Sequence, residues 1–436
     1  MHWSLMLLFI FGGVTSLMFA GMPVALAFLV VDIIGILFFF GSAGLQQLIV
    51  SMFSSLATFT LLPLPLFVLM GEVLYHSGVG PRIISTIDQW LGRIPGRLSL
   101  LAVSSGTLFA SLTGTSVGSV AMLGSTLLPD MQRRGYKQPM TLGPIMASGG
   151  LAVMIPPSGL AVLLGVIGEI SVGDTLVAIV IPGFLLAFVY AVYIIGRAYL
   201  QPSLAPPYDA AKVPLREKMR GLMAYVVPIG IVIFLVIGVI VLGIATPSEA
   251  AASGVLGTML LAAYHRQLTF EVLWKSLRST LEISAMILLI ISGATAFGQI
   301  LALSGASKGL SELAVTLPVA PILIIIAMQA VVLVMGMFME VVSIMLITLP
   351  IFMPIVRTLG FDPVWFGVLF LVNCEIALIS PPFGISLFVM KGVAPPGTTM
   401  RDVYVASVPF VGLIGFVMAL IMIFPDLALW LPRVAG

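Results

Sequence analysis

Two short stretches of small and polar residues interrupt segments of the chain that are otherwise apolar. The first runs from Ser111 to Ser119 and the second from Gly336 to Ser343. Unwound backbone at membrane depth is tolerated only where protein or a water-filled cavity covers it. The hydroxyl and freed carbonyl oxygens of such stretches suit Na⁺ as ligands, and helix N-termini that face the gap attract an anion. These residues therefore indicate ion and anion binding.

A second pair of interruptions follows these stretches. Ser148-Gly149-Gly150 precedes Pro156-Pro157, and Asn373-Cys374-Glu375 precedes Pro381-Pro382. Each Pro-Pro pair removes two amide donors and its rings clash with the preceding turn, so both helices must open there. The alternative is that small residues and prolines serve only close packing and kinking. Because the interruptions occupy corresponding positions, we favour two oxygen-rich pockets near the middle of the bilayer.

Four acidic residues fall at membrane depth, where each is costly. They are Asp32, Glu72, Glu340 and Glu375. An ionised carboxylate at the bilayer centre costs about 2.5 to 3.5 kcal/mol on insertion scales. Glu340 is the first choice for a carboxylate that serves a cation and Glu375 the second, whereas we expect packing or snorkelling for Asp32 and Glu72. No Lys or Arg lies in the four interruptions, so an anion would be held by hydroxyls, helix ends and bound Na⁺, or by side chains whose position the sequence does not predict.

The composition places these residues in a lipid bilayer. The chain has 436 residues, of which 60% are hydrophobic and 8% charged, and its mean hydropathy is +1.22. A soluble globular protein is excluded. The formal charge of +2 and the lack of long basic runs argue against nucleic acid as a partner. One cysteine and three scattered histidines argue against a zinc centre or an intramembrane enzyme.

The apolar runs predict ten crossings and two re-entrant hairpins, over 98–129 and 319–354. The crossings lie near 4–20, 24–40, 60–76, 140–168, 175–196, 222–243, 248–264, 282–303, 364–390 and 403–424. With the N-terminus outside, only Lys308, Arg357 and Arg433 of the 19 Lys and Arg residues fall outside, and 16 fall inside. This bias agrees with the positive-inside rule and supports the hairpins. Both termini are then expected on the outer side.

An internal repeat relates the two halves. An offset of 225 superposes Pro129 on Pro354 and Pro156-Pro157 on Pro381-Pro382. Because four full crossings and one re-entrant hairpin lie between 140–168 and its copy 364–390, the second copy runs through the membrane in the opposite direction, as in many secondary transporters. The sequence therefore predicts an all-α membrane protein with an inverted repeat and two hairpins.

The repeat also suggests a division of the chain. The expected parts are scaffold helices and a first arm (1–97), transport half 1 (98–200), a cytoplasmic linker (201–221), scaffold helices and a second arm (222–318), and transport half 2 (319–436). The arms, Gly44–Phe59 and Leu268–Ile283, mix charged or polar and apolar residues. They suit helices that lie along the interface, or simple interfacial loops.

These residues resemble the large membrane subunit of tripartite ATP-independent periplasmic (TRAP) transporters over nearly the whole chain. The resemblance rests on the order and spacing of Gly114-Thr-Ser116, Pro129 to Tyr136, Ile155-Pro-Pro-Ser158, Gly336-Met-Phe338, Val372-Asn373, Ser380 to Gly384 and Leu429-Trp-Leu-Pro432. It implies an elevator-type fold like that of the ion transporter superfamily, in the bacterial inner membrane. It also implies Na⁺ as the coupling ion and uptake of a small organic anion, a carboxylate or sugar acid.

The resemblance implies two protein partners: a small four-helix membrane subunit and a soluble periplasmic substrate-binding protein. Because the chain starts directly at the large subunit, we expect the small subunit to be separate. The alternatives are a two-hairpin Na⁺/carboxylate symporter that needs no binding protein, and a passive channel.

The resemblance also implies site residues at the hairpin tips and the opposing helix breaks. The Na⁺ candidates are Thr113, Gly114, Thr115, Ser116, Ser148, Gly150, Met337, Glu340, Ser343, Asn373 and Glu375. The substrate candidates are Ser119, Ser158 and Ser386. Two positions depart from the family pattern: Met339-Glu340 replaces an Asp-containing turn, and Ser386 stands where Asn is frequent.

Overall fold

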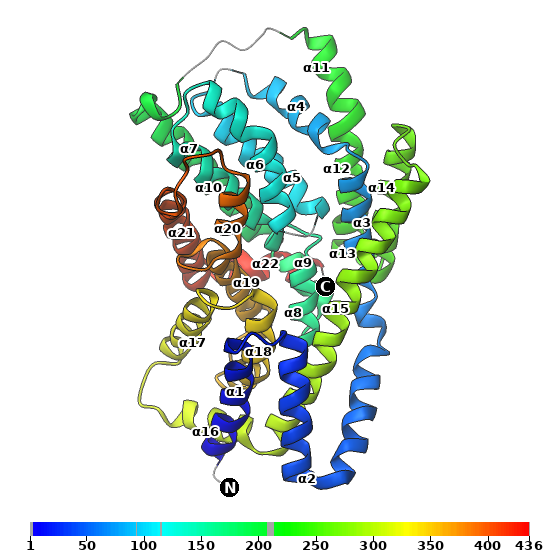
Figure 1. The fold of residues 1–436 in the computed structure, drawn as a ribbon, viewed down its shortest axis with the longest axis vertical. Coiled ribbons are helices and arrows are strands. Elements are labelled where there is room, and N and C mark those ends of the chain that lie inside the picture. The colour runs from blue at the N-terminus through cyan, green and yellow to red at the C-terminus, as the bar shows by residue number, and fades with distance from the viewer. Residues whose placement is uncertain (1–2, 93, 114–115, 207–212, 436) are drawn as a thin grey trace.

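The structure is a computed structural model that describes residues 3–92, 94–113, 116–206 and 213–435, and these residues form helices and connecting loops (Figure 1). The first half contains α1 (Trp3–Phe19), α2 (Val24–Leu56), η1 (Phe59–Leu61), α3 (Pro63–His76), α4 (Gly80–Leu91), α5 (Arg97–Thr113), α6 (Ser116–Arg133), α7 (Gln138–Gly150), η2 (Leu151–Val153), α8 (Gly159–Ile167), α9 (Val172–Ala178) and α10 (Val180–Leu200). No strand occurs in this part of the chain or in the rest of the described residues.

The second half is also helical throughout. It contains η3 (Pro202–Leu204), α11 (Leu215–Gly221), η4 (Leu222–Val226), α12 (Val227–Ile233), η5 (Phe234–Gly238), α13 (Val239–Val241), α14 (Pro247–Tyr264), α15 (Phe270–Leu303), α16 (Ala306–Thr316), α17 (Pro321–Gly336), α18 (Val341–Thr358), α19 (Pro363–Ile379), α20 (Ile385–Val393), α21 (Met400–Ile423) and α22 (Asp426–Ala435). The last residues of the expected linker, from Leu215, are therefore helical and continue directly into the next span.

Several helices are long and apolar enough to cross a membrane. Among the described residues these are Phe59–His76, Val172–Leu200, Leu215–Val241, Phe270–Leu303, Val341–Thr358 and Met400–Ile423, and shorter apolar helices accompany them. Large apolar side chains such as Phe188, Phe234 and Leu260 are exposed on the outside. A surface of this kind is stable against lipid tails and not against water.

Hairpin-like helix pairs stand where the sequence predicts them. α5 and α6 pack on each other, and so do α17 and α18. The second helix of each pair is longer than expected, because α6 extends to Arg133 through Pro129 and α18 extends to Thr358 through Pro354. In Figure 1 the two pairs lie toward opposite ends of the molecule.

The two halves are interlaced. Within a half, α5 packs on α7 and α17 packs on α19; between halves, α6 packs on α20 and α18 packs on α8. The outer helices exchange in the same way, with α2 against α15 and α14 against α3. Every one of these contacts has a counterpart in the other half, which is the arrangement that an inverted repeat requires.

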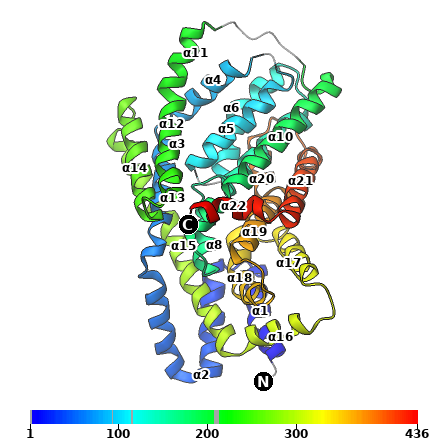
Figure 2. The same ribbon diagram turned by 180° about the vertical axis from the view of Figure 1, so that it is seen from behind.

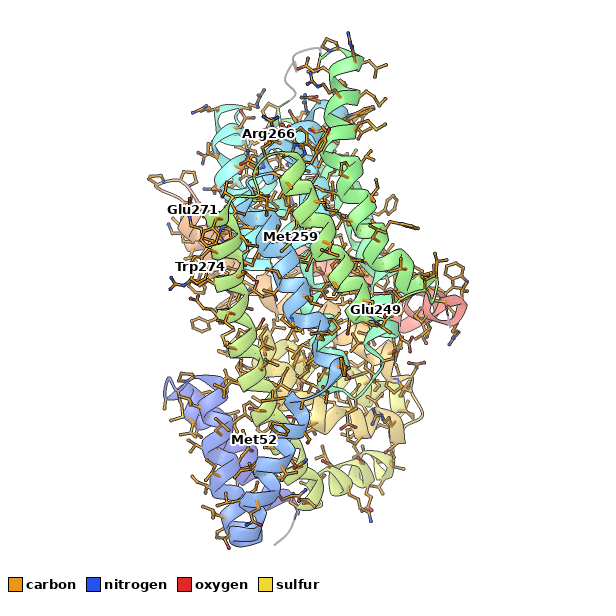
Figure 3. The ribbon with its side chains drawn as sticks, turned by 90° about the vertical axis from the view of Figure 1, so that its right-hand side faces the viewer. Met52, Glu249, Met259, Arg266, Glu271 and Trp274 are labelled. Carbon is orange, nitrogen blue, oxygen red and sulfur yellow. The ribbon has the colours of Figure 1, made fainter. Side chains whose placement is uncertain are left out.

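The two regions expected to form arms differ from each other in the structure. α15 is one helix of 34 residues, so Leu268–Ile283 does not form an element apart from the span that follows it. In the first half, α2 is interrupted at Gly41, whose φ of 63° is left-handed and suits glycine, and its second part runs to Leu56. Figure 3 looks onto α14 and α15, where Trp274 and Glu271 are exposed on the surface of α15.

The ends of the chain lie at different levels. The N-terminal helix α1 lies at one end of the molecule, beside α16. The C-terminal helix α22 lies near the middle, where it packs on α9, α10 and α19 (Figure 2).

Candidate functional site

The two broken helices cross at positions that the internal repeat makes equivalent. α7 ends at Gly150 and is followed by the short η2, and α19 passes this point at Glu375, one repeat offset later. A Cβ atom on Gly150 would lie 2.8 Å from Cγ and 3.0 Å from Oε1 of Glu375. The missing side chain of Gly150 is thus what admits the carboxyl group of Glu375 to the crossing.

Glu375 is fully buried, and only one of its two carboxylate oxygens accepts a hydrogen bond from a described residue. Its Oε1 accepts a hydrogen bond of 2.9 Å from the hydroxyl of Tyr190 in α10. Its Oε2 has no hydrogen-bond partner among the described residues. Burying a carboxylate without a compensating charge is costly, so this group requires either a proton or a cation beside it.

Asn373 lies two residues earlier on α19 and is also fully buried. Its Nδ2 donates to the backbone carbonyl of Gln329 in α17 at 2.6 Å and to the side-chain Oε1 of Gln329 at 2.9 Å. Its Oδ1 accepts no hydrogen bond from any described group. Residues two apart on a helix do not face each other. The free oxygens of Asn373 and Glu375 are therefore presented toward different neighbours.

In the first half, the equivalent of Asn373 is Ser148. Its hydroxyl donates to the carbonyls of Pro144 and Ile145 in its own helix, at 2.6 and 3.0 Å. α5 approaches it closely, because a Cβ on Gly106 would lie 2.5 Å from Cβ of Ser148. The neighbouring Gly149 lies so close to α6 that a Cβ there would be 3.2 Å from the carbonyl oxygen of Ser116.

The first hairpin tip reaches the second half of the chain. α5 ends at Thr113 and α6 begins at Ser116, whose Oγ lies 3.4 Å from Oγ of Ser386 in α20. One Na⁺ candidate and one substrate candidate are therefore in contact. Ser119 follows one turn later on α6 and is fully buried. Gly114, Thr115 and the side chain of Thr113 lie outside the described residues.

At the second tip, Glu340 serves as the N-cap of α18. Its Oε2 accepts hydrogen bonds from the backbone amides of Val342 and Ser343, at 3.1 and 3.3 Å. Glu340 is exposed, whereas Ser343 is fully buried. Met337 is the C-cap of α17. A carboxylate at a helix N-terminus satisfies amides that the helix cannot, so Glu340 has a local structural role in this conformation.

The proline breaks separate α7 from α8 and α19 from α20. The Pro156–Pro157 and Pro381–Pro382 bonds are both cis. After the first break, Ser158 is fully buried and its hydroxyl accepts from the amide of Ala161, which makes it the N-cap of α8. Ser158 therefore begins a new helix, and no hydrogen bond among the described residues joins its side chain to the other candidates.

The remaining two membrane-depth acids have different surroundings. Glu72 is partly buried, and its Oε2 lies 3.2 Å from Nε2 of His76, one turn later on α3. Asp32 is fully buried on α2, and neither of its oxygens has a described hydrogen-bond partner. Snorkelling is therefore wrong for Asp32, because its carboxyl group does not reach the surface.

Two residues that form hydrogen bonds with the site were not predicted from the sequence. Gln329 is a lone amide in the otherwise apolar run 321–335, a pattern that could have marked it. Tyr190 stands in an apolar span with other aromatic residues, and nothing in its local sequence distinguishes it. Only the packing of α10 against the crossing gives its hydroxyl a role.

A family signature matches almost the whole chain. The family described as "Tripartite ATP-independent periplasmic transporter, DctM component" matches residues 11–427. The C4-dicarboxylate TRAP transporter large permease protein DctM of Rhodobacter capsulatus is 31% identical, and the alignment covers 98% of this chain and 99% of that one.

Two further relatives carry different substrate names. The isethionate TRAP transporter permease protein DctMQ of Oleidesulfovibrio alaskensis is 29% identical over 88% of this chain and 60% of its own length. The ectoine TRAP transporter large permease protein TeaC of Halomonas elongata is 27% identical over 96% of this chain and 97% of its own.

The fold is also found among solved structures. The crystal structure of the Alcanivorax borkumensis YdaH transporter is similar, with a TM-score of 0.65 at 14% identity, over 87% of this chain and 88% of that one. An identity this low concerns the fold alone. It confirms the prediction of an all-helical membrane protein with two hairpins.

Proposed function

Because the chain belongs to the family of DctM components of tripartite ATP-independent periplasmic transporters, we propose that it is the large membrane subunit of a Na⁺-coupled importer of a small organic anion. Membership in this family makes the chain a multi-pass transport permease and not an enzyme. The coupling ion, the charge of the substrate and the transport mechanism are the parts that we propose.

The crossing of the broken helices carries the proposal for Na⁺. Asn373 and Glu375 each present a buried oxygen without a described donor, and the helix break at Gly150 lies against Glu375. Buried polar groups in proteins are almost always partnered. A hard cation such as Na⁺ satisfies oxygens of this kind, and its charge offsets that of the carboxylate.

The names of the relatives and the hydroxyl groups near the first tip support the proposed substrate class. Ser116, Ser119 and Ser386 lie on facing helices and offer hydroxyls. Relatives are named for C4-dicarboxylate and isethionate, and one for ectoine. A carboxylate or sugar acid held by hydroxyls, helix ends and bound Na⁺ fits this arrangement.

We propose an elevator mechanism in which 98–200 and 319–436 move as a transport group against scaffold helices in 1–97 and 222–318. The interlaced packing of α6 on α20 and of α18 on α8 supports this division, because it joins the two hairpins into one body. The substrate would cross the membrane with that body.

The expected partners are a small four-helix membrane subunit and a soluble periplasmic binding protein. The DctMQ relative is longer than this chain, which covers 60% of it, and its name combines two components. The expected location is the bacterial inner membrane, with both termini on the periplasmic side.

The deciding experiment is uptake into proteoliposomes that contain this chain, its small subunit and its binding protein. The substrate is chosen by a ligand screen on the binding protein encoded beside the gene. Uptake should require an inward Na⁺ gradient, and equal uptake in potassium or choline would disprove the coupling. Uptake by this chain alone would instead favour a symporter that needs no binding protein.

A further inference from the structure

We propose that the cavity between α15 and α18 admits the substrate anion, and that Arg357 attracts and orients its carboxylate. The cavity, here called the α15–α18 cavity, has a volume of about 600 Å³. This inference rests on the proposed function, because it names a subsite for the anion that the importer would carry.

The walls of the cavity come from the two bodies that the proposed mechanism separates. On the scaffold side they include Thr58 and Thr60 before α3, and Thr295 and Gln299 of α15. On the transport side they include the α18 face up to Arg357 and the turn 165–170 that ends α8. A molecule bound there would touch both bodies at once.

Hydrogen bonds hold the Arg357 side chain in place but occupy only part of its N–H donors. Its Nη2 donates to the carbonyls of Gly168 and Glu169, at 3.1 and 2.9 Å, where α8 ends. Its Nη1 lies 3.8 Å from a carboxylate oxygen of Glu169. The guanidinium has five N–H donors in a rigid fork, so Nε and Nη1 remain able to donate to a ligand. The side chain is 43% exposed.

The charge balance of the cavity favours an anion at this point. Arg357 and Glu169 are the only charged residues among those that line it. The Glu169 side chain is 81% exposed, so its pairing with Arg357 is weak and easily exchanged. A bound carboxylate could take a bidentate position on the guanidinium, which is geometrically better than the present 3.8 Å contact.

The remaining lining suits the rest of a small polar molecule. The hydroxyls of Thr58, Thr60 and Thr295 and the amide of Gln299 can donate or accept hydrogen bonds. The lining also contains apolar side chains, which can contact the carbon skeleton of such a molecule. The four interruptions contain no Lys or Arg, so Arg357 supplies a basic side chain that they lack. In the proposed orientation, Arg357 is also one of three basic residues on the outer side.

The test measures the charge preference of the cavity without requiring transport. Gln299→Cys is introduced, and spheroplasts that express the full complex are treated from outside with an anionic and with a cationic methanethiosulfonate reagent. The native Cys374 is fully buried, so the parent chain serves as the unlabelled background. We expect the ratio of anionic to cationic labelling rates to fall by roughly fivefold with Arg357→Gln.

Two variants separate this effect from a loss of folding. Arg357→Lys keeps the charge and should keep the ratio within about twofold of the parent. Arg433→Gln removes another outer basic residue, which pairs with Asp426 on α22, and should leave the ratio unchanged. The proposal is wrong if the cysteine at position 299 does not react, or if Arg357→Gln leaves the ratio of anionic to cationic labelling rates unchanged.

The failure of this inference is distinguishable from failure of the proposed function. If the ratio of labelling rates depends on Arg357 but uptake does not depend on the Na⁺ gradient, the cavity proposal is supported and the proposal of Na⁺ coupling is wrong. If uptake is driven by Na⁺ and the KM for the substrate is unaffected by Arg357→Gln, the proposal of Na⁺ coupling is supported and the proposed role of Arg357 is wrong.

Discussion

Gly150 and Glu375 occupy equivalent positions in the two halves, and the space at the crossing accommodates one side chain. The Glu375 carboxyl group fills it, bonded on one side to Tyr190. The charge of the buried site thus depends on a single acid contributed by the second half. Its energetics are set by what neutralises that acid, because a buried charge that loses its partner is strongly destabilising.

Gly150→Ala tests this crossing directly. The added Cβ would lie 2.8 Å from Cγ of Glu375 in a closely packed region, so we expect a loss of about 1 to 3 kcal/mol in stability. Thermal unfolding of the purified complex with and without Na⁺ measures it. Gly415→Ala is the control, because a Cβ there meets nothing within 4 Å. Equal unfolding temperatures for the two variants would contradict the crossing.

Glu375→Gln tests the carboxylate itself. If Glu375 balances a bound cation, the concentration of Na⁺ that half-saturates uptake should rise at least about tenfold, equivalent to about 1.4 kcal/mol. Tyr190→Phe removes the hydroxyl that contacts Oε1 and should produce a smaller shift. An unchanged Na⁺ dependence in Glu375→Gln would remove this residue from the ion site.

A ranking of the other acids tests the second hairpin tip. We expect Glu340→Gln to weaken Na⁺ dependence more than Glu72→Gln, since Glu340 lies at the tip whereas Glu72 pairs with His76 on α3. Removal of the charge at the N-cap would also cost α18 about 0.3 to 1 kcal/mol, since the amide oxygen of glutamine can still accept from the backbone N–H groups. Both variants are compared by Na⁺ titration of uptake. A reversed order would place the ion-linked carboxylate elsewhere.

At the residue scale, the sequence allowed individual site residues to be predicted, but not the residues that form hydrogen bonds with them. Membrane-depth acids and helix breaks stand out because each is costly in lipid, which is why Glu375 and Gly150 could be named. The hydrogen bonds from Tyr190 and Asn373 depend on how α10 and α17 pack on α19. Such packing has no local signature in the chain.

Among the elements, the broken helices and hairpins were predictable from glycine and proline. α17 ends at Gly336 and α18 begins at Val341, as the polar stretch indicates. The expected second arm, Leu268–Ile283, is continuous with the following span, because the chain from Phe270 to Ser292 contains no glycine or proline. Charge alone marks a change of environment and does not end a helix.

Gly336→Ala tests how closely the second hairpin packs on α19. The new Cβ would lie 2.3 Å from Cβ of Ala377, so the helices must separate and the unfolding temperature should fall, for a loss of about 1 to 3 kcal/mol. Gly392→Ala on α20 is the matched control, with nothing within 4 Å of its Cβ. Similar melting curves for both variants would show that α17 is not held tightly.

For the whole molecule, relative motion of the two bodies can be tested by cross-linking across the α15–α18 cavity. Gln299 on the scaffold wall and Met353 on the transport wall are replaced by cysteine and joined by a bifunctional maleimide. If the bodies must slide past each other, uptake should fall at least about tenfold. The control joins Thr295→Cys to Gln299→Cys, one turn apart on α15, and should retain uptake. Full activity of the bridged Gln299–Met353 pair would contradict the elevator.

The overall topology was predictable because an inverted duplication constrains it twice. Proline and glycine positions gave the repeat, and the distribution of Lys and Arg gave its inversion. The exchange of α6, α18, α2 and α14 between halves was not predictable, since each apolar helix could in principle pack within its own half. The choice is made by the shapes of many facing side chains together.

The pairing of Gly150 with Glu375 bears on how such a protein could arise. A homodimer of two identical half-length chains would place the same residue at both positions, either two acids in a space for one or two glycines with no acid at all. Joining the copies in one chain lets the two positions differ. A single carboxylate at the crossing is therefore possible in a chain that contains both copies, and it is not possible in a symmetric homodimer of half-length chains.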